Sequence, residues 1–148
     1  MKLMKMVTVT LFALATAPAF AQVTVENAWA RATAPGATVA AGYMVIRNAG
    51  AADRLVGASS PAAERVEMHV TQRDGDVSRM RQVLAYEVKD SFELKPGGAH
   101  LMFVNIKAPF TEGQKIPVVL KFEKGGEMKT EFHVGRITAG SHGHHKGH

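Results

Sequence analysis

The chain of 148 residues contains no cysteine. This absence excludes disulfide bonds, thiolate metal sites and cysteine nucleophiles. Any metal site must therefore be built from imidazole, thioether, carboxylate or amide groups, and the folded state must be stabilised by its core alone.

Apolar runs long enough to cross a membrane are also lacking. The longest lies near the N-terminus, where two lysines precede a short apolar core at Val7–Ala15 and an A-x-A cleavage sequence at Ala19–Ala21. This core is shorter than a membrane-spanning helix requires. We expect residues 1–21 to be a signal peptide that is cleaved after Ala21, leaving an exported chain with no membrane span.

The chain has little charge of one sign in any one place. Its formal net charge is +5 and falls to about +3 once the two signal-peptide lysines are removed. Arg79 and Arg81 alternate with other residue types, whereas nucleic-acid surfaces cluster basic side chains on one face. No G-x-S-x-G nucleophile elbow is present either. We expect neither a nucleic-acid partner nor hydrolase activity.

Long apolar stripes with helical periodicity are absent after residue 21. Short runs typical of β-strands recur instead, separated by Gly-, Pro- and Asn-containing turn signals such as Asp74-Gly75 and Pro96-Gly97-Gly98. The expected strands are 23–25, 42–47, 54–58, 65–71, 77–84, 91–94, 99–107, 115–122 and 128–134. This pattern predicts an all-β sandwich or barrel, folded as a single domain over residues 22–138.

Two histidines and two methionines stand out within this pattern. Asp74-Gly75 is a strong hairpin signal, and if these residues form the turn centre, His69 directly faces Met80. Directly opposed residues share a face, with Cβ atoms about 4.5–5.5 Å apart. His100 and Met102 lie two apart in an apolar run, so they share a face of one strand. That the two pairs meet is a tertiary hypothesis.

The chemistry of these four side chains favours copper. Thioether sulfur is a soft, neutral donor that suits Cu(I) together with imidazole, whereas zinc sites use thiolate, imidazole or carboxylate. Methionine also avoids disulfide chemistry in an oxidising compartment. We therefore predict a Cu(I) site formed by His69, Met80, His100 and Met102.

Other residues of the same types are better explained by packing. Met68 points to the opposite face of its strand from His69, so we expect it in the core. Met44 lies between Tyr43 and Val45 and also suggests strand packing. We expect His133 to lie at the surface.

The last ten residues differ from the rest. Residues 139–148 are rich in glycine and carry four histidines, which suggests a flexible metal-binding tail. Clustered imidazoles bind Cu(II), Ni(II) or Zn(II) without a fixed geometry. The candidate Cu(II) ligands are His142, His144, His145 and His148.

These residues resemble the periplasmic copper chaperone family PCuAC. Its mark is a His, ten residues, a Met, twenty-one residues, then His-x-Met. Here His69, ten residues and Met80 are followed by nineteen residues and His100-Leu101-Met102, two fewer than usual. Further matches are the Asn27–Arg31 opening, Ala41-Gly42-Tyr43-Met44 with Arg47-Asn48, and Lys95-Pro96-Gly97-Gly98.

The resemblance implies a cupredoxin-like Greek-key β-sandwich or barrel in the periplasm. It also implies a non-enzymatic role: carrying Cu(I) to the CuA centre of cytochrome c oxidase, sometimes alongside Sco-type thiol proteins. Some family members carry a C-terminal extension that takes up Cu(II), which the histidine tail resembles.

Three alternatives use the same residues differently. A copper storage or resistance protein needs the site but no delivery partner. A redox protein would reduce tail-bound Cu(II) and pass it to the core site, with an external reductant because the chain has no thiol. A plain β-sandwich scaffold would bind Cu(I) only weakly.

Overall fold

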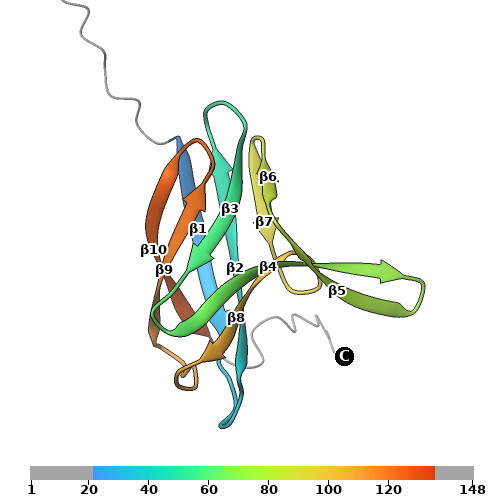
Figure 1. Cartoon of the computed structure of the whole chain (residues 1–148), viewed down its shortest axis with the longest axis vertical. Helices are drawn as coiled ribbons and strands as arrows, with labels where there is room; N and C mark the ends of the chain where they lie inside the picture. Colours follow the sequence, from blue (N-terminus) through green and yellow to red (C-terminus); the bar gives the residue numbers. More distant parts are fainter. Residues whose placement is uncertain (1–21, 136–148) are drawn as a thin grey trace, which may run out of the picture.

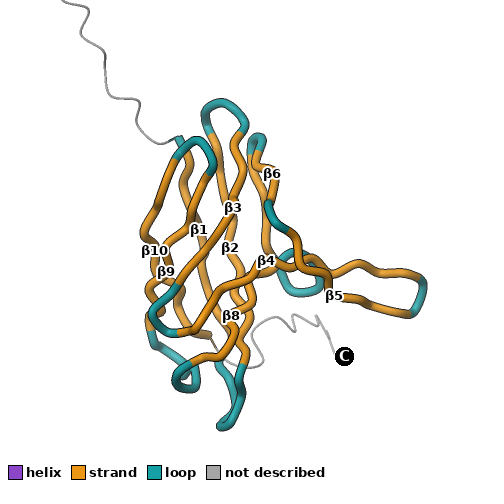
Figure 2. Tube along the Cα trace, in the orientation of Figure 1, coloured by secondary structure: helices purple, strands orange, loops and turns teal. Residues whose placement is uncertain are grey.

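The structure is a computed structural model that describes residues 22–135. The predicted signal peptide and the tail histidines lie outside the described residues. Among residues 22–135 every regular element is a β-strand (Figures 1 and 2), and this part of the chain contains no helix of the length and hydrophobicity needed to span a membrane. The strands are β1 (Val23–Arg31), β2 (Val39–Asn48), β3 (Asp53–Ser59), β4 (Ala63–Asp74), β5 (Val77–Val83), β6 (Tyr86–Val88), β7 (Ser91–Leu94), β8 (His100–Ile106), β9 (Lys115–Phe122) and β10 (Gly126–Gly135).

Seven of these strands close into a barrel. They follow the order β4-β8-β2-β1-β10-β9-β3, and the ring is closed by pairing of β3 with β4 at Ala58 and Val66. All neighbouring pairs are antiparallel except β1 and β10, which are parallel. The remaining strands extend the sheet: β5 pairs with β4, β6 with β3 and β7 with β2. The predicted all-β barrel class is confirmed.

The barrel interior is filled by side chains that alternate along each strand. On β8, Leu101 and Phe103 are both 0% exposed and point into the core, which places His100 and Met102 on the other face of the same strand. Phe103 makes edge-to-face contacts with Phe110 and Phe132 at ring-centroid distances of 5.3 and 6.0 Å. This aromatic cluster holds the inner side of the strand that carries the candidate ligands.

Gly42 on β2 is required by the packing of this cluster. A Cβ atom at that position would lie 2.8 Å from Cε2 of Phe103 and 3.0 Å from Cε2 of Phe132. Such distances are too short for carbon atoms in van der Waals contact. Only glycine lets the β2 backbone approach the two rings this closely, and the close approach brings β2 against β8.

Strand β4 is the longest strand of the fold and has two roles. From Ala63 to His69 it pairs with β8 in the barrel wall, and from Met68 to Asp74 it pairs with β5. Its second half therefore leaves the barrel and forms, with β5, a hairpin that projects from the body of the molecule (Figure 1). The candidate ligands lie where this hairpin joins the barrel.

The turn of this hairpin differs from the sequence prediction by one residue. Asp74 pairs with Val77, so the turn centre is Gly75-Asp76 rather than Asp74-Gly75. Gly75 has φ of +58°, whereas Asp76 is not among the residues with positive φ. A turn with glycine at its first central position and positive φ only there is of the II′ kind. The predicted turn centre was therefore wrong.

Strand boundaries also differ from the expected ranges. β1 continues to Arg31, well beyond the three residues expected from its alternating pattern, and a bulge between Glu26 and Trp29 accommodates Asn27 at a φ of +51°. The three-residue strand β6 was not predicted, because a segment so short shows no measurable alternation. The other expected strands are all present.

Candidate metal site

Three of the four predicted ligands share one surface of the barrel wall. His69 on β4 is paired directly with His100 on β8, and their ring centroids are 5.6 Å apart. Two residues along, Met102 on β8 is paired with Glu67 on β4. Because residues two apart on a strand point to the same side, His69, His100 and Met102 face the same way. The hypothesis that the two predicted pairs meet is thus confirmed for these three residues.

Met80 lies farther away than the sequence predicted. The shifted turn pairs Met80 with Thr71, and His69 faces Gln82 instead. The predicted direct opposition of His69 and Met80 was therefore wrong. Thr71 and His69 are two apart on β4, so Met80 still lies on the same face as His69, as its diagonal neighbour. Diagonal neighbours on a sheet are about 7–8 Å apart, and Met80 is 62% exposed.

His100 is the most buried member of the group, with 5% of its surface exposed. Its Nδ1 atom lies 3.2 Å from the carbonyl oxygen of Gly98. A carbonyl oxygen only accepts hydrogen bonds, so Nδ1 carries the proton and donates it. In the neutral ring the lone pair is then on Nε2. Burial lowers the pKa of His100, which keeps the ring in this neutral, metal-binding form.

His69 is held in the opposite tautomer by Glu67. Nε2 of His69 donates to Oε2 of Glu67 over 2.9 Å, while Nε of Arg65 donates to Oε1 over 2.8 Å. The hydrogen bond from Arg65, followed by that from His69, lowers the pKa of Glu67, so this group is an ionised carboxylate that only accepts. When the His69 ring is neutral, its lone pair is therefore on Nδ1.

The two nitrogens left with lone pairs have no partner. Nδ1 of His69 and Nε2 of His100 are both buried, and neither makes a hydrogen bond within residues 22–135. Buried polar atoms are nearly always hydrogen-bonded, and an exception requires an explanation. Two such atoms on directly paired residues, with a thioether on the same face, are explained if they hold an ion together.

The backbone of both histidines is clamped from behind by Tyr86. Its hydroxyl lies 2.5 Å from the carbonyl oxygen of His69 and 2.8 Å from that of His100. Burial raises the pKa of Tyr86 to about 12, so the hydroxyl remains a donor. Tyr86 also stacks on Phe92 at a ring-centroid distance of 4.8 Å. The hydroxyl thereby fixes β4 and β8 side by side at the level of the candidate ligands.

Removing this hydroxyl tests the clamp. Tyr86→Phe keeps the stack on Phe92 but leaves both carbonyl groups without this donor, and is expected to lower the free energy of unfolding by about 1–3 kcal/mol. Urea unfolding measures the loss. Tyr43→Phe is the matched control, because the Tyr43 hydroxyl makes no hydrogen bond within the described part of the chain. Equal stabilities of the two variants would contradict the clamp.

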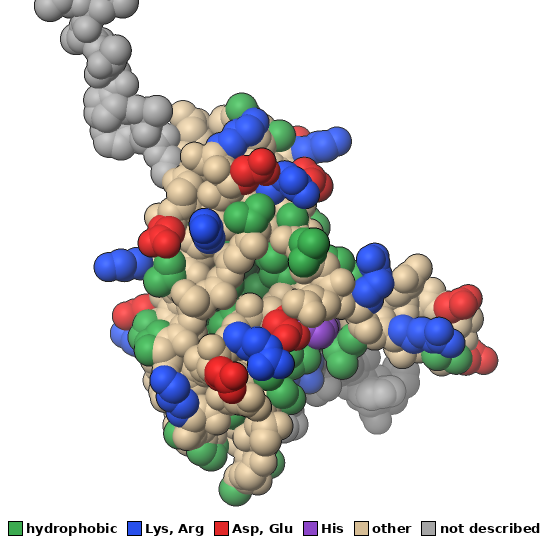
Figure 3. Space-filling model, viewed as in Figure 1, with side chains coloured by type: hydrophobic (Ala, Val, Ile, Leu, Met, Phe, Trp, Pro, Cys, Tyr) green, Lys and Arg blue, Asp and Glu red, His purple; other side chains and the backbone are tan. Residues whose placement is uncertain are grey.

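Two aromatic rings border the site on the β2 side. Tyr43 lies 6.5 Å from His100 and Trp29 lies 4.7 Å from Tyr43, measured between ring centroids. The guanidinium carbon of Arg31 lies 5.7 Å from the Tyr43 ring centroid. Burial raises the pKa of Tyr43 although the charge of Arg31 opposes this. These rings shield His100 from one side. A histidine is visible at the surface beside the projecting hairpin (Figure 3).

Sequence reasoning assigned three packing and surface residues correctly but missed two groups that contact the candidate ligands. Met68 and Met44 are buried, at 6% and 1% exposure, and His133 is exposed, as predicted. Glu67 was missed, although its position two residues before His69 places it on the same face. Tyr86 was missed because nothing near it in the sequence indicates a contact with β4 and β8.

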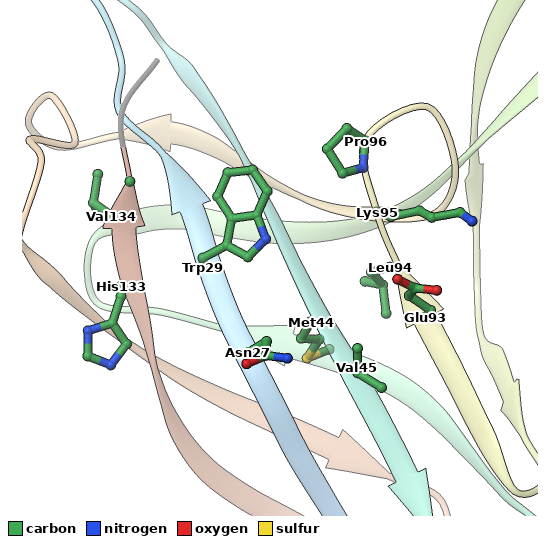
Figure 4. A pocket seen from close by; sticks show the side chains of 11 residues that line it. Asn27, Trp29, Met44, Val45, Glu93, Leu94, Lys95, Pro96, His133 and Val134 are labelled. Carbon is green, nitrogen blue, oxygen red and sulfur yellow. The ribbon is translucent and has the colours of Figure 1, made fainter. Parts of the chain in front are cut away.

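A depression with a volume of about 670 Å³ is lined by residues of β1, β2, β7 and β10 and of the loop that follows β7. Trp29 rises from β1 toward the loop that carries Pro96, while His133 lies on the neighbouring strand β10 (Figure 4). None of the four predicted ligands lines it. The described residues also contain no cluster of three or more histidine or carboxylate side chains suited to a harder metal ion.

Comparison with known proteins agrees with this architecture. The family described as "LpqE-like: Putative lipoprotein LpqE-like" matches residues 23–134, which is the whole barrel. The chain belongs to the LpqE-like family. A relative from Leifsonia xyli subsp. xyli (strain CTCB07), described as "Putative lipoprotein Lxx21020", is 35% identical over 107 residues. The match covers 70% of this chain and 63% of the relative, so the chain spans less than two thirds of that protein's length.

Solved structures of PCuAC domains share the fold of this LpqE-like chain. The copper-bound PCuAC domain from PmoF2 is 27% identical, with a TM-score of 0.68 and coverage of 80% of this chain and 96% of the domain. The apo form of the PmoF2 domain is 28% identical, with a TM-score of 0.66 and coverage of 80% and 94%. CuI-DR1885 from Deinococcus radiodurans is 24% identical, with a TM-score of 0.59 and coverage of 82% and 81%, a likeness of fold alone. The barrel is therefore of the PCuAC type.

Proposed function

We propose that this LpqE-like chain binds Cu(I) as cargo through His69, His100 and Met102, with Met80 as a fourth, more exposed ligand. The observation that carries the proposal is the pair of buried, unpartnered imidazole nitrogens on directly paired residues. Met102 adds a thioether on the same face. Copper in the solved structure of the PmoF2 PCuAC domain supports the same cargo here.

The donor set favours Cu(I) over harder ions. Two neutral imidazoles and thioether sulfur are soft ligands, whereas calcium, magnesium and manganese prefer oxygen donors. Structural zinc sites rely on thiolates, imidazoles and carboxylates in a closed tetrahedral set. Within residues 22–135, the carboxylate that contacts an imidazole of the site is that of Glu67, and it is already engaged by Arg65 and His69. A monovalent ion requires the least charge compensation from such a site.

Release by ligand exchange follows from the unequal exposure of the ligands. His100 is nearly inaccessible, at 5% exposure, whereas Met80 on the projecting hairpin is 62% exposed. An acceptor reaches the ion from the Met80 side and replaces that thioether first, and the buried imidazoles leave last. No bond other than those to copper is made or broken, so the role is that of a carrier and not of an enzyme.

The wider role rests on the resemblance to PCuAC proteins. The chain delivers Cu(I) toward the CuA centre of cytochrome c oxidase, directly or with a Sco-type thiol protein. The lipoprotein description of its relatives supports export, with the signal peptide at residues 1–21 cleaved after Ala21 to release the chain to the periplasm. The tail captures Cu(II) through its four histidines.

An anaerobic Cu(I) competition titration tests the site. The tail-substituted protein, which is the full chain carrying His142→Gln, His144→Gln, His145→Gln and His148→Gln, is titrated against a chromophoric chelator. One tight equivalent of Cu(I) is expected, and it should weaken strongly when Met80→Ala and Met102→Ala are added together. Met128→Ala is the control, because Met128 lies outside the site and is only partly buried.

Tight binding that is lost when the tail histidines are replaced, or that is unchanged when Met80 and Met102 are replaced, would contradict the proposal.

The alternative of copper storage is distinguished by the phenotype of a strain lacking the protein. A carrier supports oxidase activity in limiting copper, whereas a storage protein supports growth in excess copper.

A further inference from the structure

Glu67 makes the contact that decides which nitrogen His69 can offer. Its carboxylate accepts the Nε2 proton of His69 over 2.9 Å, and only 20% of the Glu67 side chain and 16% of the His69 side chain are exposed. Arg65 holds the other carboxylate oxygen over 2.8 Å. Glu67 is therefore fixed from both sides, and the His69 ring is fixed with it.

We propose that Glu67 is the positioning residue of the copper site, which presents His69 through Nδ1 while the Gly98 carbonyl presents His100 through Nε2. This inference rests on the proposed Cu(I) function and adds to it the ligating atom of each histidine. The two rings lie on directly paired residues, but Glu67 accepts from one and the Gly98 carbonyl accepts from the other. Their opposite tautomers therefore leave both lone pairs on buried nitrogens that have no hydrogen-bond partner within residues 22–135.

The arrangement has two physical consequences for the ion. A carboxylate that accepts from the distal nitrogen of a metal-bound imidazole fixes the ring orientation and raises the basicity of the ligating nitrogen. The negative charge of Glu67 also compensates a monovalent cation without joining its coordination sphere. Because Glu67 is paired with Met102, it would lie next to a bound ion on the β4 side, and the attraction between opposite charges strengthens as their separation falls.

Two alternative roles for Glu67 give different expectations. If Glu67 served only the fold, through its ion pair with Arg65, its removal would affect stability and leave the His69 tautomer unchanged. If Glu67 were itself a copper ligand, its hydrogen bond to Nε2 would break when copper binds. The tautomer of His69 before and after metal addition separates these roles from positioning.

The test uses the tail-substituted protein with ¹⁵N-labelled histidine. Long-range ¹H–¹⁵N correlation spectra of the metal-free protein are expected to show His69 protonated on Nε2 and His100 protonated on Nδ1. Anaerobic Cu(I) should shift the resonances of the two bare nitrogens and leave both protonated nitrogens protonated. Protonation of His69 on Nδ1 in the metal-free protein would overturn the proposal. Loss of the proton from Nε2 of His69 when copper binds would overturn it as well, because Nε2 would then no longer donate to Glu67.

Variants at position 67 supply the second measurement. Glu67→Ala is expected to mix the two tautomers of His69 and to weaken Cu(I) binding by about 10- to 100-fold, the range typical of losing a residue that orients a metal ligand. Glu67→Gln retains an oxygen acceptor and should recover part of the affinity and the Nε2-protonated tautomer. Glu64→Ala is the matched control, because Glu64 lies on the same strand and contacts Asn105 and Arg65 but neither histidine.

Each outcome supports or overturns the inference. Unchanged tautomer and affinity in Glu67→Ala would show that Glu67 does not position His69. If the unsubstituted site binds no Cu(I), the proposed function fails and this inference fails with it, whatever the spectra show. If Cu(I) binds but the variants at position 67 match the Glu64→Ala control, only the positioning role fails.

Discussion

Replacing His100 by alanine in the tail-substituted protein is expected to weaken Cu(I) binding by more than about 100-fold. Losing a metal ligand should weaken metal binding more than losing a group that orients a ligand, which typically weakens it by about 10- to 100-fold. We expect His100 to have the largest effect of the four ligands because it is the most buried, at 5% exposure. The Gly98 carbonyl accepts a hydrogen bond from the His100 ring, but it cannot replace the imidazole as a metal ligand.

Anaerobic competition titration measures this loss, with His133→Ala as the control. His133 is exposed on β10 and lies outside the site, so its removal should leave the affinity unchanged. An affinity in His100→Ala within about threefold of the parent protein would mean that copper binds elsewhere. Such a change is smaller than the about 1.4 kcal/mol of binding free energy that corresponds to a factor of ten, and loss of a ligand should cost more.

Replacing Phe103 by alanine is expected to lower the free energy of unfolding by about 3–5 kcal/mol. Phe103 is 0% exposed and packs edge-to-face against Phe110 and Phe132, so its removal leaves a cavity at the centre of the barrel. The total stability of a domain this size is on the order of 5–15 kcal/mol, which makes the loss a large fraction of the whole.

Urea unfolding of the metal-free protein measures this change. Val77→Ala is the control, since Val77 is 51% exposed on β5 and surface substitutions generally change stability by within about 0.5 kcal/mol. A cost for Phe103→Ala no greater than that of the control would show that the three phenylalanines do not form the core described. Because His100 and Met102 lie on the outer face of the same strand, this core also supports the site.

The predictable part of the site was the part determined within single strands. Alternation alone assigned His100 and Met102 to one face of a strand and Met68 to the face opposite His69, and the structure agrees on both. The face of a side chain has a period of two residues, so it can be counted along the sequence without knowledge of the neighbouring strand.

Pairing between distant strands could not be counted in this way. His69 and His100 are 31 positions apart, and their direct pairing depends on β4 and β8 lying side by side in the barrel wall. The hairpin register was wrong because an Asp-Gly-Asp sequence permits glycine at either central position of the turn. The resulting shift preserved the face of Met80 and altered only its partner.

The two supporting groups show the same distinction. Glu67 is two residues from His69, so alternation contained the signal for its contact. Tyr86 reaches the carbonyl groups of His69 and His100 from the three-residue strand β6, and no local pattern indicates such a contact. The closed barrel class itself was predictable, because many short strands separated by turns and no helical stripe leave few alternatives.

X-ray absorption spectroscopy at the copper edge, on tail-substituted protein loaded anaerobically with one equivalent of Cu(I), tests the central claim most directly. We predict a reduced copper ion whose nearest neighbours include both nitrogen and sulfur, with the sulfur contribution lost when Met80→Ala and Met102→Ala are combined. A shell of nitrogen and oxygen alone in the unsubstituted site would contradict the assignment of His69, His100 and the methionines as a Cu(I) carrier site.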